Sequence, residues 1–329
     1  MMKPRERLEK CLAGEEVDRP PVALWRHFPT DDLTPFTLAR SVVLFQNTYN
    51  FDFVKITFAS SYASRDWGTV ESWDGNPEGS GSVTTFPIEY PQDWAKIKVH
   101  SPTQGALGDA LECIRLVRTA LPAEISIIPT IFSPLAQAKH LAGKERLSEH
   151  LRKAPDALLA ALEVISEQTI LFIRECKKLG IDGIFYAVQH AQKHLMTEPE
   201  FVRFGMEDDL RILAEVQDLW LNVGHIHGSQ IMFDKAVKYP VNVLNWHDRE
   251  ENIALQYGLG KFKGAVCGGL RQWDTMVYGM PDKVRSESLD AVDQTGGKRF
   301  ILGTGCVLPI IAPHSNILAA IETVTSSGD

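Results

Sequence analysis

The sequence predicts an α/β fold, a (β/α)8 TIM barrel, from three observations. Eight short apolar stretches recur along the 329 residues, most are followed by a segment with helical spacing or composition, and no linker-like stretch divides the chain. Near-continuous apolar strands that alternate with helices are typical of a parallel sheet covered on both faces. Eight such units favour a closed barrel over an open sheet. We therefore expect one domain over residues 1–329.

The candidate strands are apolar runs, several of which end in polar or metal-competent side chains. They are PVALWRH (21–27), FVKIT (53–57), SIIPTIF (126–132), GIFYAVQ (183–189), LNVGHIH (221–227), VNVLNWH (241–247), GAVCGGL (264–270) and FILGTGC (300–306). Residues 106–121 and 154–180 place apolar residues at intervals of three and four, which predicts amphipathic helices, with Gly180 ending the second. Residues 60–97 are rich in Gly, Pro, Ser and Asp and predict loops and a hairpin inserted after the second strand.

Composition and charge exclude several classes of function. The chain is 44% hydrophobic and 23% charged, which is globular, and its net charge of -8 offers no basic footprint for nucleic acid or an anionic membrane surface. No apolar run approaches the ~20 residues that span a bilayer, and the charged N-terminus does not resemble a secretory signal. Five scattered cysteines without a CxxC pair fit a reducing compartment. We expect a cytoplasmic protein with a small-molecule substrate, without nucleic-acid or membrane partners.

In a barrel of this type the functional site lies at the C-terminal ends of the strands. In VGHIHG (223–228) one residue separates two histidines, so His225 and His227 point to the same side of an extended strand. Together with Cys306 at the end of the last strand they supply three ligands, the arrangement of a catalytic zinc with an open fourth position. The alternative is two hydrogen-bonded barrel histidines beside a packed cysteine. Cys267 could replace or supplement Cys306, or be a buried free thiol.

Other strand-end residues are candidates for binding and proton transfer. His247 in NWHDRE could donate a hydrogen bond or serve as acid or base, or be a satisfied histidine at a strand-to-loop junction. Tyr186, Gln189 and Asn245 could orient a polar substrate or tie loops. The chain contains no Walker motif, GxGxxG, GxSxG or HExxH, which removes most support for nucleotide binding and for the common hydrolase chemistries.

Three stretches of the chain, in order and across nearly its full length, resemble the uroporphyrinogen decarboxylase superfamily. They are MKPRERLEKCLAGEEVDRPPVALW at the start, LGIDGIFYAVQ with VGHIHG in the middle, and ILGTGCVLPIIAPHSNILAAIETV at the end. The resemblance implies a (β/α)8 barrel. True decarboxylases of this superfamily carry an RQAGRY motif after the first strand and an aspartate after the second. Here LWRHFPTDD keeps Arg26 alone and FVKITFASS has no aspartate, so porphyrinogen decarboxylation is not expected.

The other branch of the superfamily consists of cobalamin-dependent methyltransferases. They hold zinc with a His-x-Cys pair and a later cysteine. By this resemblance His225 and Cys306 match ligand positions, and His227 stands where the pair has its cysteine. A nitrogen in place of a thiolate removes one negative charge and makes the metal more Lewis acidic.

Two enzymatic hypotheses and one non-catalytic hypothesis follow. The first is a zinc-dependent methyltransferase or demethylase that acts on a small methoxylated or methylated substrate and passes the methyl group to a corrinoid on a partner protein or to another acceptor. The second is a metal-independent decarboxylase or other lyase of a small carboxylate or tetrapyrrole-like substrate, in which Arg26 pairs with the carboxylate and His247 handles the proton. The third is a relative that only binds a small ligand. Members of the superfamily often dimerise, which makes a homodimer an expectation here.

Overall fold

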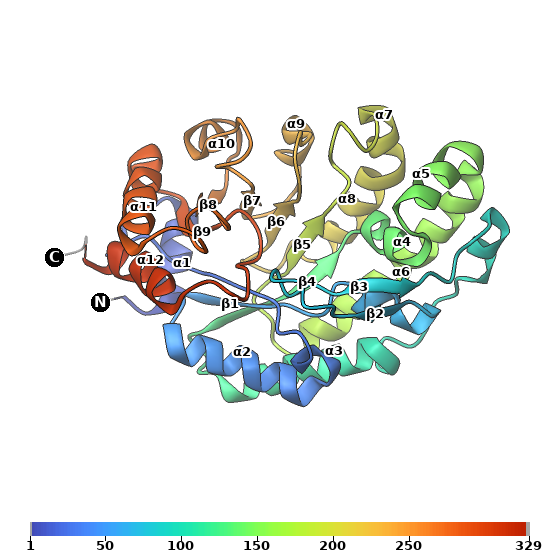
Figure 1. The fold of residues 1–329 in the computed structure, drawn as a ribbon, viewed down its shortest axis with the longest axis horizontal. Coiled ribbons are helices and arrows are strands. Elements are labelled where there is room, and N and C mark those ends of the chain that lie inside the picture. The colour runs from blue at the N-terminus through green and yellow to red at the C-terminus, as the bar shows by residue number, and fades with distance from the viewer. Residues whose placement is uncertain (1, 327–329) are drawn as a thin grey trace.

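The computed structural model describes residues 2–326, and its centre is a parallel sheet that curls into a barrel-like wall (Figure 1). Seven strands follow one another in the order β1-β4-β5-β6-β7-β8-β9. Their bounds are β1 (Phe53–Ile56), β4 (Ser126–Phe132), β5 (Phe185–Val188), β6 (Val223–Ile226), β7 (Val243–Trp246), β8 (Ala265–Leu270) and β9 (Phe300–Thr304). Each lies inside one of the predicted strand segments, so seven of the eight predicted strands are confirmed.

The first predicted strand, over 21–27, is wrong in extent. Only Val22 forms an isolated bridge, to Leu302 of β9. Pro20 and Pro21 have no N–H group to donate, which limits the ladder this segment can form. Its remaining groups still join the two edges of the sheet: the Ala23 N–H donates to Leu302 O at 3.0 Å on one side, and the Asp52 N–H donates to Val22 O at 2.9 Å on the other. The segment thus fills the place of the eighth strand without regular pairing.

Helices surround the curled sheet. They are α1 (Pro4–Ala13), α2 (Pro35–Tyr49), α3 (Gly105–Ala120), α4 (Pro134–Ala142), α5 (Lys144–Lys153), α6 (Pro155–Lys178), α7 (Glu198–Phe201), α8 (Glu207–Ala214), α9 (Phe233–Ala236), α10 (Leu255–Lys261), α11 (Pro281–Thr295) and α12 (His314–Ser326). A π-helical turn, η4 (Val202–Met206), joins α7 to α8. α3 and α6 confirm the two helices predicted from apolar spacing. Gly180 follows α6 with φ of 76°, a conformation that favours glycine and ends the helix.

Residues 60–97 run between β1 and α3. They contain two short 3-10 helices, η2 (Tyr62–Trp67) and η3 (Pro91–Lys96), and an antiparallel hairpin of β2 (Val70–Ser72) and β3 (Ser82–Thr85). The hairpin reaches the loop after β9, where the Ile310 N–H donates to Pro77 O at 2.9 Å. It also reaches the loop after β8, where Trp273 Nε1 donates to Glu78 Oε1 at 3.2 Å. The hairpin therefore lies over the same end of the barrel as the loops that follow the strands.

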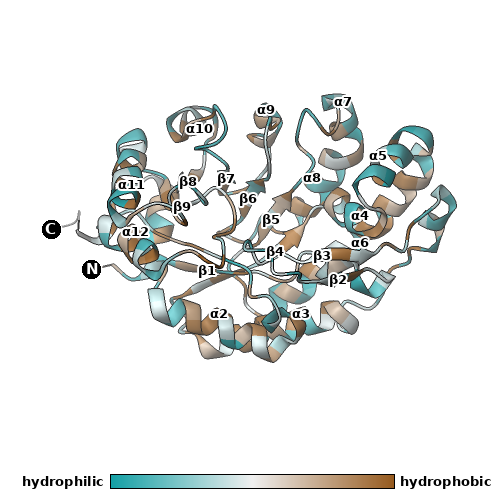
Figure 2. Cartoon of the chain, in the orientation of Figure 1, coloured by the Kyte–Doolittle hydropathy of each residue, from teal (hydrophilic) through white to brown (hydrophobic). Residues whose placement is uncertain are grey.

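The apolar residues form one continuous core between sheet and helices, and all seven strands of the large sheet are buried along their length. Figure 2 shows hydrophobic residues on the strands and the inner faces of the helices, with hydrophilic residues outside. Within residues 2–326, no helix combines the length and apolar character needed to cross a membrane.

Candidate metal centre

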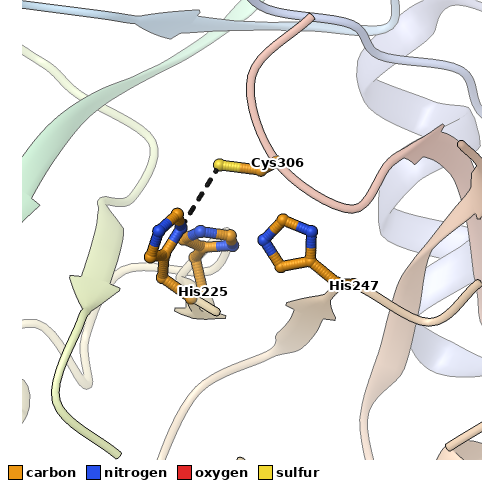
Figure 3. A group of neighbouring side chains, drawn as sticks. His225, His247 and Cys306 are labelled. Atoms are coloured by element: carbon orange, nitrogen blue, oxygen red, sulfur yellow. Dashed lines mark hydrogen bonds between the residues drawn. The ribbon is translucent and has the colours of Figure 1, made fainter. Parts of the chain in front are cut away.

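Four side chains that can ligate a metal meet at the C-terminal ends of three strands. His225 and His227 come from the end of β6, His247 follows β7, and Cys306 follows β9. One ligand atom from each lies within 4.8 Å of the others. In Figure 3 the side chains of His225, His247 and Cys306 converge on a common point. The three ligands predicted from the sequence are brought together, and His247, predicted as an acid or base, joins them.

Local backbone geometry explains how the four residues meet. His225 and His227 occupy alternate positions, which places both rings on one side of β6, as predicted. Cys306 reaches the group because the turn after β9 passes very close to the end of β7. A Cβ on Gly305 would lie 2.7 Å from His247 Cα and 2.9 Å from Trp246 O. Only glycine permits this approach without displacement of the backbone.

The hydrogen bonds of Asn245 fix the tautomer of His225. Strand register sets His225 of β6 opposite Asn245 of β7. The Asn245 amide nitrogen donates to Cys267 O at 2.9 Å and to Thr304 O at 3.0 Å, so its oxygen must face His225. That oxygen lies 2.7 Å from His225 Nδ1, which therefore carries the proton and donates it. The lone pair of His225 is left on Nε2, the atom available to a metal.

The unpartnered nitrogens of the group fit a metal ion. Nε2 of His225 and Nε2 of His247 are buried, and neither has a hydrogen-bond partner within residues 2–326. Buried polar atoms are rarely left in this state without a function. Burial, the largest cause in each case, lowers the pKa of His227 to about 3 and that of His247 to about 4. Both rings are therefore neutral at pH 7, the protonation state that a metal requires.

The spacing of the cysteine and its nearest histidine also suits zinc. Cys306 Sγ lies 3.6 Å from His227 Nδ1. Tetrahedral zinc with Zn–N of about 2.05 Å and Zn–S of about 2.3 Å separates the two ligand atoms by roughly 3.6 Å. Burial raises the pKa of the Cys306 thiol to about 11, although the nearby Lys55 ammonium opposes this shift. The thiolate would thus require a metal to persist at neutral pH.

A cavity of about 230 Å³ opens beside three of the four side chains, those of His225, His227 and Cys306. Its lining combines aromatic residues, such as Trp25 and Phe185, with the polar side chains of Lys55, Lys139 and Gln189. Gln189 was predicted from the sequence to bind substrate, and its Oε1 accepts a hydrogen bond from Lys139 Nζ at 2.7 Å. The arrangement can hold a small ligand with one end against the metal ligands.

Two other predicted site residues, Tyr186 and Arg26, lie away from this cavity. The Tyr186 hydroxyl is fully buried and donates to Asp209 at 2.6 Å, so it ties β5 to α8. Arg26 donates to Ile310 O at 3.3 Å, and its guanidinium lies 5.2 Å from the centre of the Phe28 ring. Neither residue lines the cavity.

Asn245 and Cys267, two further candidates from the sequence, lie neither in the lining of the cavity nor among the metal-ligating side chains. Asn245 is completely buried and acts on His225 rather than on the cavity. Cys267 is also completely buried, and within the described chain it is not part of the metal-ligating group. Its thiol therefore corresponds to the buried-packing alternative.

Two lysines that line the cavity, Lys55 and Lys139, are not among the site residues predicted from the sequence. Lys55 lies in the middle of the apolar run FVKIT, and a charge inside an otherwise buried strand is the signal that could have identified it. Burial lowers the pKa of its ammonium to about 7. Lys139 lies in the last turn of α4, in a composition that looks like an ordinary helix surface.

Comparisons with known proteins agree with this geometry. The family model described as uroporphyrinogen decarboxylase (URO-D) matches residues 35–327. A methylcobamide:CoM methyltransferase, MtbA, of Methanosarcina acetivorans is 21% identical over 97% of this chain and 96% of its own length. A methyltransferase structure from Methanosarcina mazei superposes with a TM-score of 0.86 at 19% identity and covers 100% of both chains. A B12-independent methionine synthase from Shewanella sp. W3-18-1 in complex with selenomethionine gives a TM-score of 0.57 at 12% identity, over 94% of this chain and 98% of that one.

Proposed function

The chain belongs to the uroporphyrinogen decarboxylase (URO-D) family, and we propose that within it the protein is a metal-dependent methyltransferase or demethylase. Its substrate is a small methoxylated or methylated molecule, and a corrinoid carried by a partner protein receives the methyl group. The observation that carries the proposal is the convergence of His225, His227, His247 and Cys306 at the mouth of the barrel. The similarity to a methylcobamide:CoM methyltransferase over nearly the full length supports the choice of reaction.

The four residues would hold zinc through three nitrogens and one thiolate. When bound, the ion supplies Lewis acidity toward the atom that carries the methyl group. With a single thiolate among its ligands the site keeps a net positive charge, which favours polarising an ether oxygen over activating a thiolate.

The remaining residues of the site orient a metal ligand and enclose the substrate. Asn245 holds the His225 ring with Nε2 toward the other ligands. Gln189 and Lys139 form one side of the cavity, and Trp25 and Phe185 provide apolar walls that restrict water. The cavity of about 230 Å³ admits a small substrate and is too small for a corrinoid, so the carrier would approach from outside, at the C-terminal ends of the strands.

Methyl transfer to free cob(I)alamin tests the proposal. Metal-loaded protein is mixed with a panel of small methyl ethers and methylamines, and formation of methylcobalamin is followed by absorbance. We expect turnover with at least one donor class, and its loss in Cys306→Ala. The reverse assay, methylation of small thiols from methylcobalamin, is run in parallel. Absence of transfer in both directions from protein with a full metal complement would contradict the proposal.

No observation favours the metal-free lyase. That hypothesis assigned the substrate carboxylate to Arg26, which lies outside the cavity, and the proton to His247, which lies among the metal ligands.

A further inference from the structure

Lys55 is the most unusual charged residue of the cavity. It is 6% exposed and lies on β1 between the aromatic walls, with Nζ 4.5 Å from the centre of the Phe185 ring and 6.0 Å from that of Trp25. Its ammonium donates to Thr57 Oγ1 at 3.1 Å. Among the described residues no Asp or Glu forms an ion pair with it. An ammonium buried with one neutral acceptor loses far more hydration than this contact returns.

The surroundings of Lys55 contain a second unsatisfied group. His27 lines the same cavity and is 7% exposed, and its Nδ1 is buried without a hydrogen-bond partner in the described part of the chain. Burial, followed by the charge of Lys55, lowers the pKa of His27 to about 3, so the ring is neutral and can act as a hydrogen-bond donor. Both residues line this cavity: the Lys55 ammonium has a single neutral acceptor, and His27 Nδ1 has no partner among the described residues. Together they indicate a ligand group that would satisfy them.

The charge of the cavity determines the sign of that ligand group. Lys55 and Lys139 contribute two amino groups to the lining, and burial lowers the pKa of Lys55 to about 7 and that of Lys139 to about 8. At pH 7 Lys139 is therefore mostly protonated and Lys55 about half protonated, and a bound anion would favour the charged form of both. Among the described lining residues Glu78 contributes the one carboxylate, which accepts from Trp273. Glu71 lies near Lys139, but its oxygens accept from the Ser61 and Gly81 amides. A metal held by one thiolate would add further positive charge. The field inside the cavity therefore favours an anion.

We propose that Lys55, with His27 beside it, is a binding subsite for an oxyanion, so that the substrate carries a carboxylate or sulfonate at the end opposite its methyl group. The inference rests on the proposed function, because it specifies the class of methyl donor. That donor is a small anionic molecule rather than a neutral amine or ether. A charge-assisted hydrogen bond from Lys55 to this oxyanion would offset the free energy of hydration that the ammonium lost on burial. The free volume of about 230 Å³ equals roughly eight water molecules, which limits the substrate to a small acid.

Lys139 differs from Lys55 and provides the matched control. It lines the same cavity and carries the same charge, but its Nζ already donates to Gln189 Oε1 at 2.7 Å and it is more exposed. Replacement of either lysine removes one positive charge from the cavity. Lys139 already donates to an amide oxygen, whereas Lys55 donates only to the Thr57 hydroxyl. Replacement of Lys55 therefore removes the donor that is free to bind an anion.

The test is anion binding by chelator-treated, metal-free protein, measured by calorimetry at constant ionic strength with acetate, methanesulfonate and neutral acetamide. We expect both anions, or one of them, to bind and acetamide not to bind. Lys55→Met should weaken anion binding about 10- to 100-fold, the ratio for one charge-assisted hydrogen bond, and Lys139→Met by less than about threefold. Acetate ahead of methanesulfonate identifies a carboxylate substrate, and the reverse order a sulfonate.

Three results would overturn the inference: acetamide binding as well as acetate, equal losses in the two lysine variants, or no loss in Lys55→Met. Folding does not obscure the outcome, because removal of an unpaired buried charge should leave the Tm of anion-free Lys55→Met at or above that of the wild type, and a fall in this Tm would also contradict the account. Metal content is measured separately on the same variants and should be unchanged. Failure of metal binding would thus refute the proposed function while the anion result stands on its own.

Discussion

Substitution of Asn245 by alanine replaces no metal ligand, but it should weaken metal binding. Asn245 is completely buried, and its amide makes three hydrogen bonds: to His225 Nδ1, to Cys267 O and to Thr304 O. At about 1 kcal/mol each, their loss costs roughly 3 kcal/mol of unfolding free energy. The His225 ring also loses the acceptor that keeps the proton on Nδ1. Loss of such a supporting partner typically lowers metal affinity about 10- to 100-fold.

Asn316 offers a control for the structural part of this effect. It is 1% exposed, and its amide nitrogen donates to Met276 O at 3.1 Å and Gly279 O at 2.8 Å, with a longer contact to Thr275 O. It lies outside the metal-ligating group. Asn316→Ala should therefore lose a similar amount of stability, about 2 to 3 kcal/mol, and keep wild-type metal affinity.

The assay is zinc competition against a chromophoric chelator under reducing conditions, beside urea unfolding of the metal-free proteins. We expect both variants to be destabilised and only Asn245→Ala to lose zinc affinity. Equal zinc affinity in the two variants would refute the role of Asn245 in orienting His225.

Three further predictions follow from the site and its surroundings. Gly305→Ala should lower zinc affinity at least about tenfold, because its Cβ would meet His247 Cα at 2.7 Å, whereas Gly260→Ala, with no atom within 4 Å, should leave it unchanged in the same competition assay. His227→Cys should still bind about one equivalent of metal, since a thiolate is also a zinc ligand, but with an altered rate of methyl transfer; unchanged metal content together with unchanged activity would argue against a ligand role for His227. The unfolding free energy of metal-free protein should fall less steeply with acid in His27→Gln than in the wild type: the folded-state pKa of His27 is lowered from 6.5 to about 3, so its contribution is present above pH 6.5 and is lost as pH falls, by up to about 1.4 kcal/mol per pH unit. Urea titrations at pH 7, 6 and 5 measure this difference, and parallel curves would contradict it.

The fold was accessible from the sequence because its signals are local. Each of the seven regular strands is an apolar run of strand length. The buried face of α6 is marked by apolar residues at repeated intervals of three and four. Residues 21–27 have the same apolar character, yet they pair at a single residue. Hydrophobicity reports burial, whereas strand pairing also requires free N–H groups in register, which the two prolines reduce.

The site was accessible only in part, because side-chain direction depends on register and turns. His225, His227 and Cys306 could be grouped because strand-end positions and the two-residue spacing specify where they point. Tyr186 lies within β5, two residues before the C-terminal end of that strand, on its outer face. Its hydroxyl donates to Asp209 of α8, a partner 23 residues away in sequence. The position of His247 among the ligands depends on the close passage at Gly305, which no local pattern indicates.

Metal content is the most direct test of the account. Tag-free protein is reconstituted with zinc under reducing conditions, and bound metal is quantified by mass spectrometry for the wild type, His225→Ala, His247→Ala and Cys306→Ala. We expect about one equivalent of zinc in the wild type and a large loss in each variant, because every ligand of a compact site contributes to affinity. A wild type without metal after reconstitution, or variants that retain it in full, would contradict the central claim that these side chains form one metal centre.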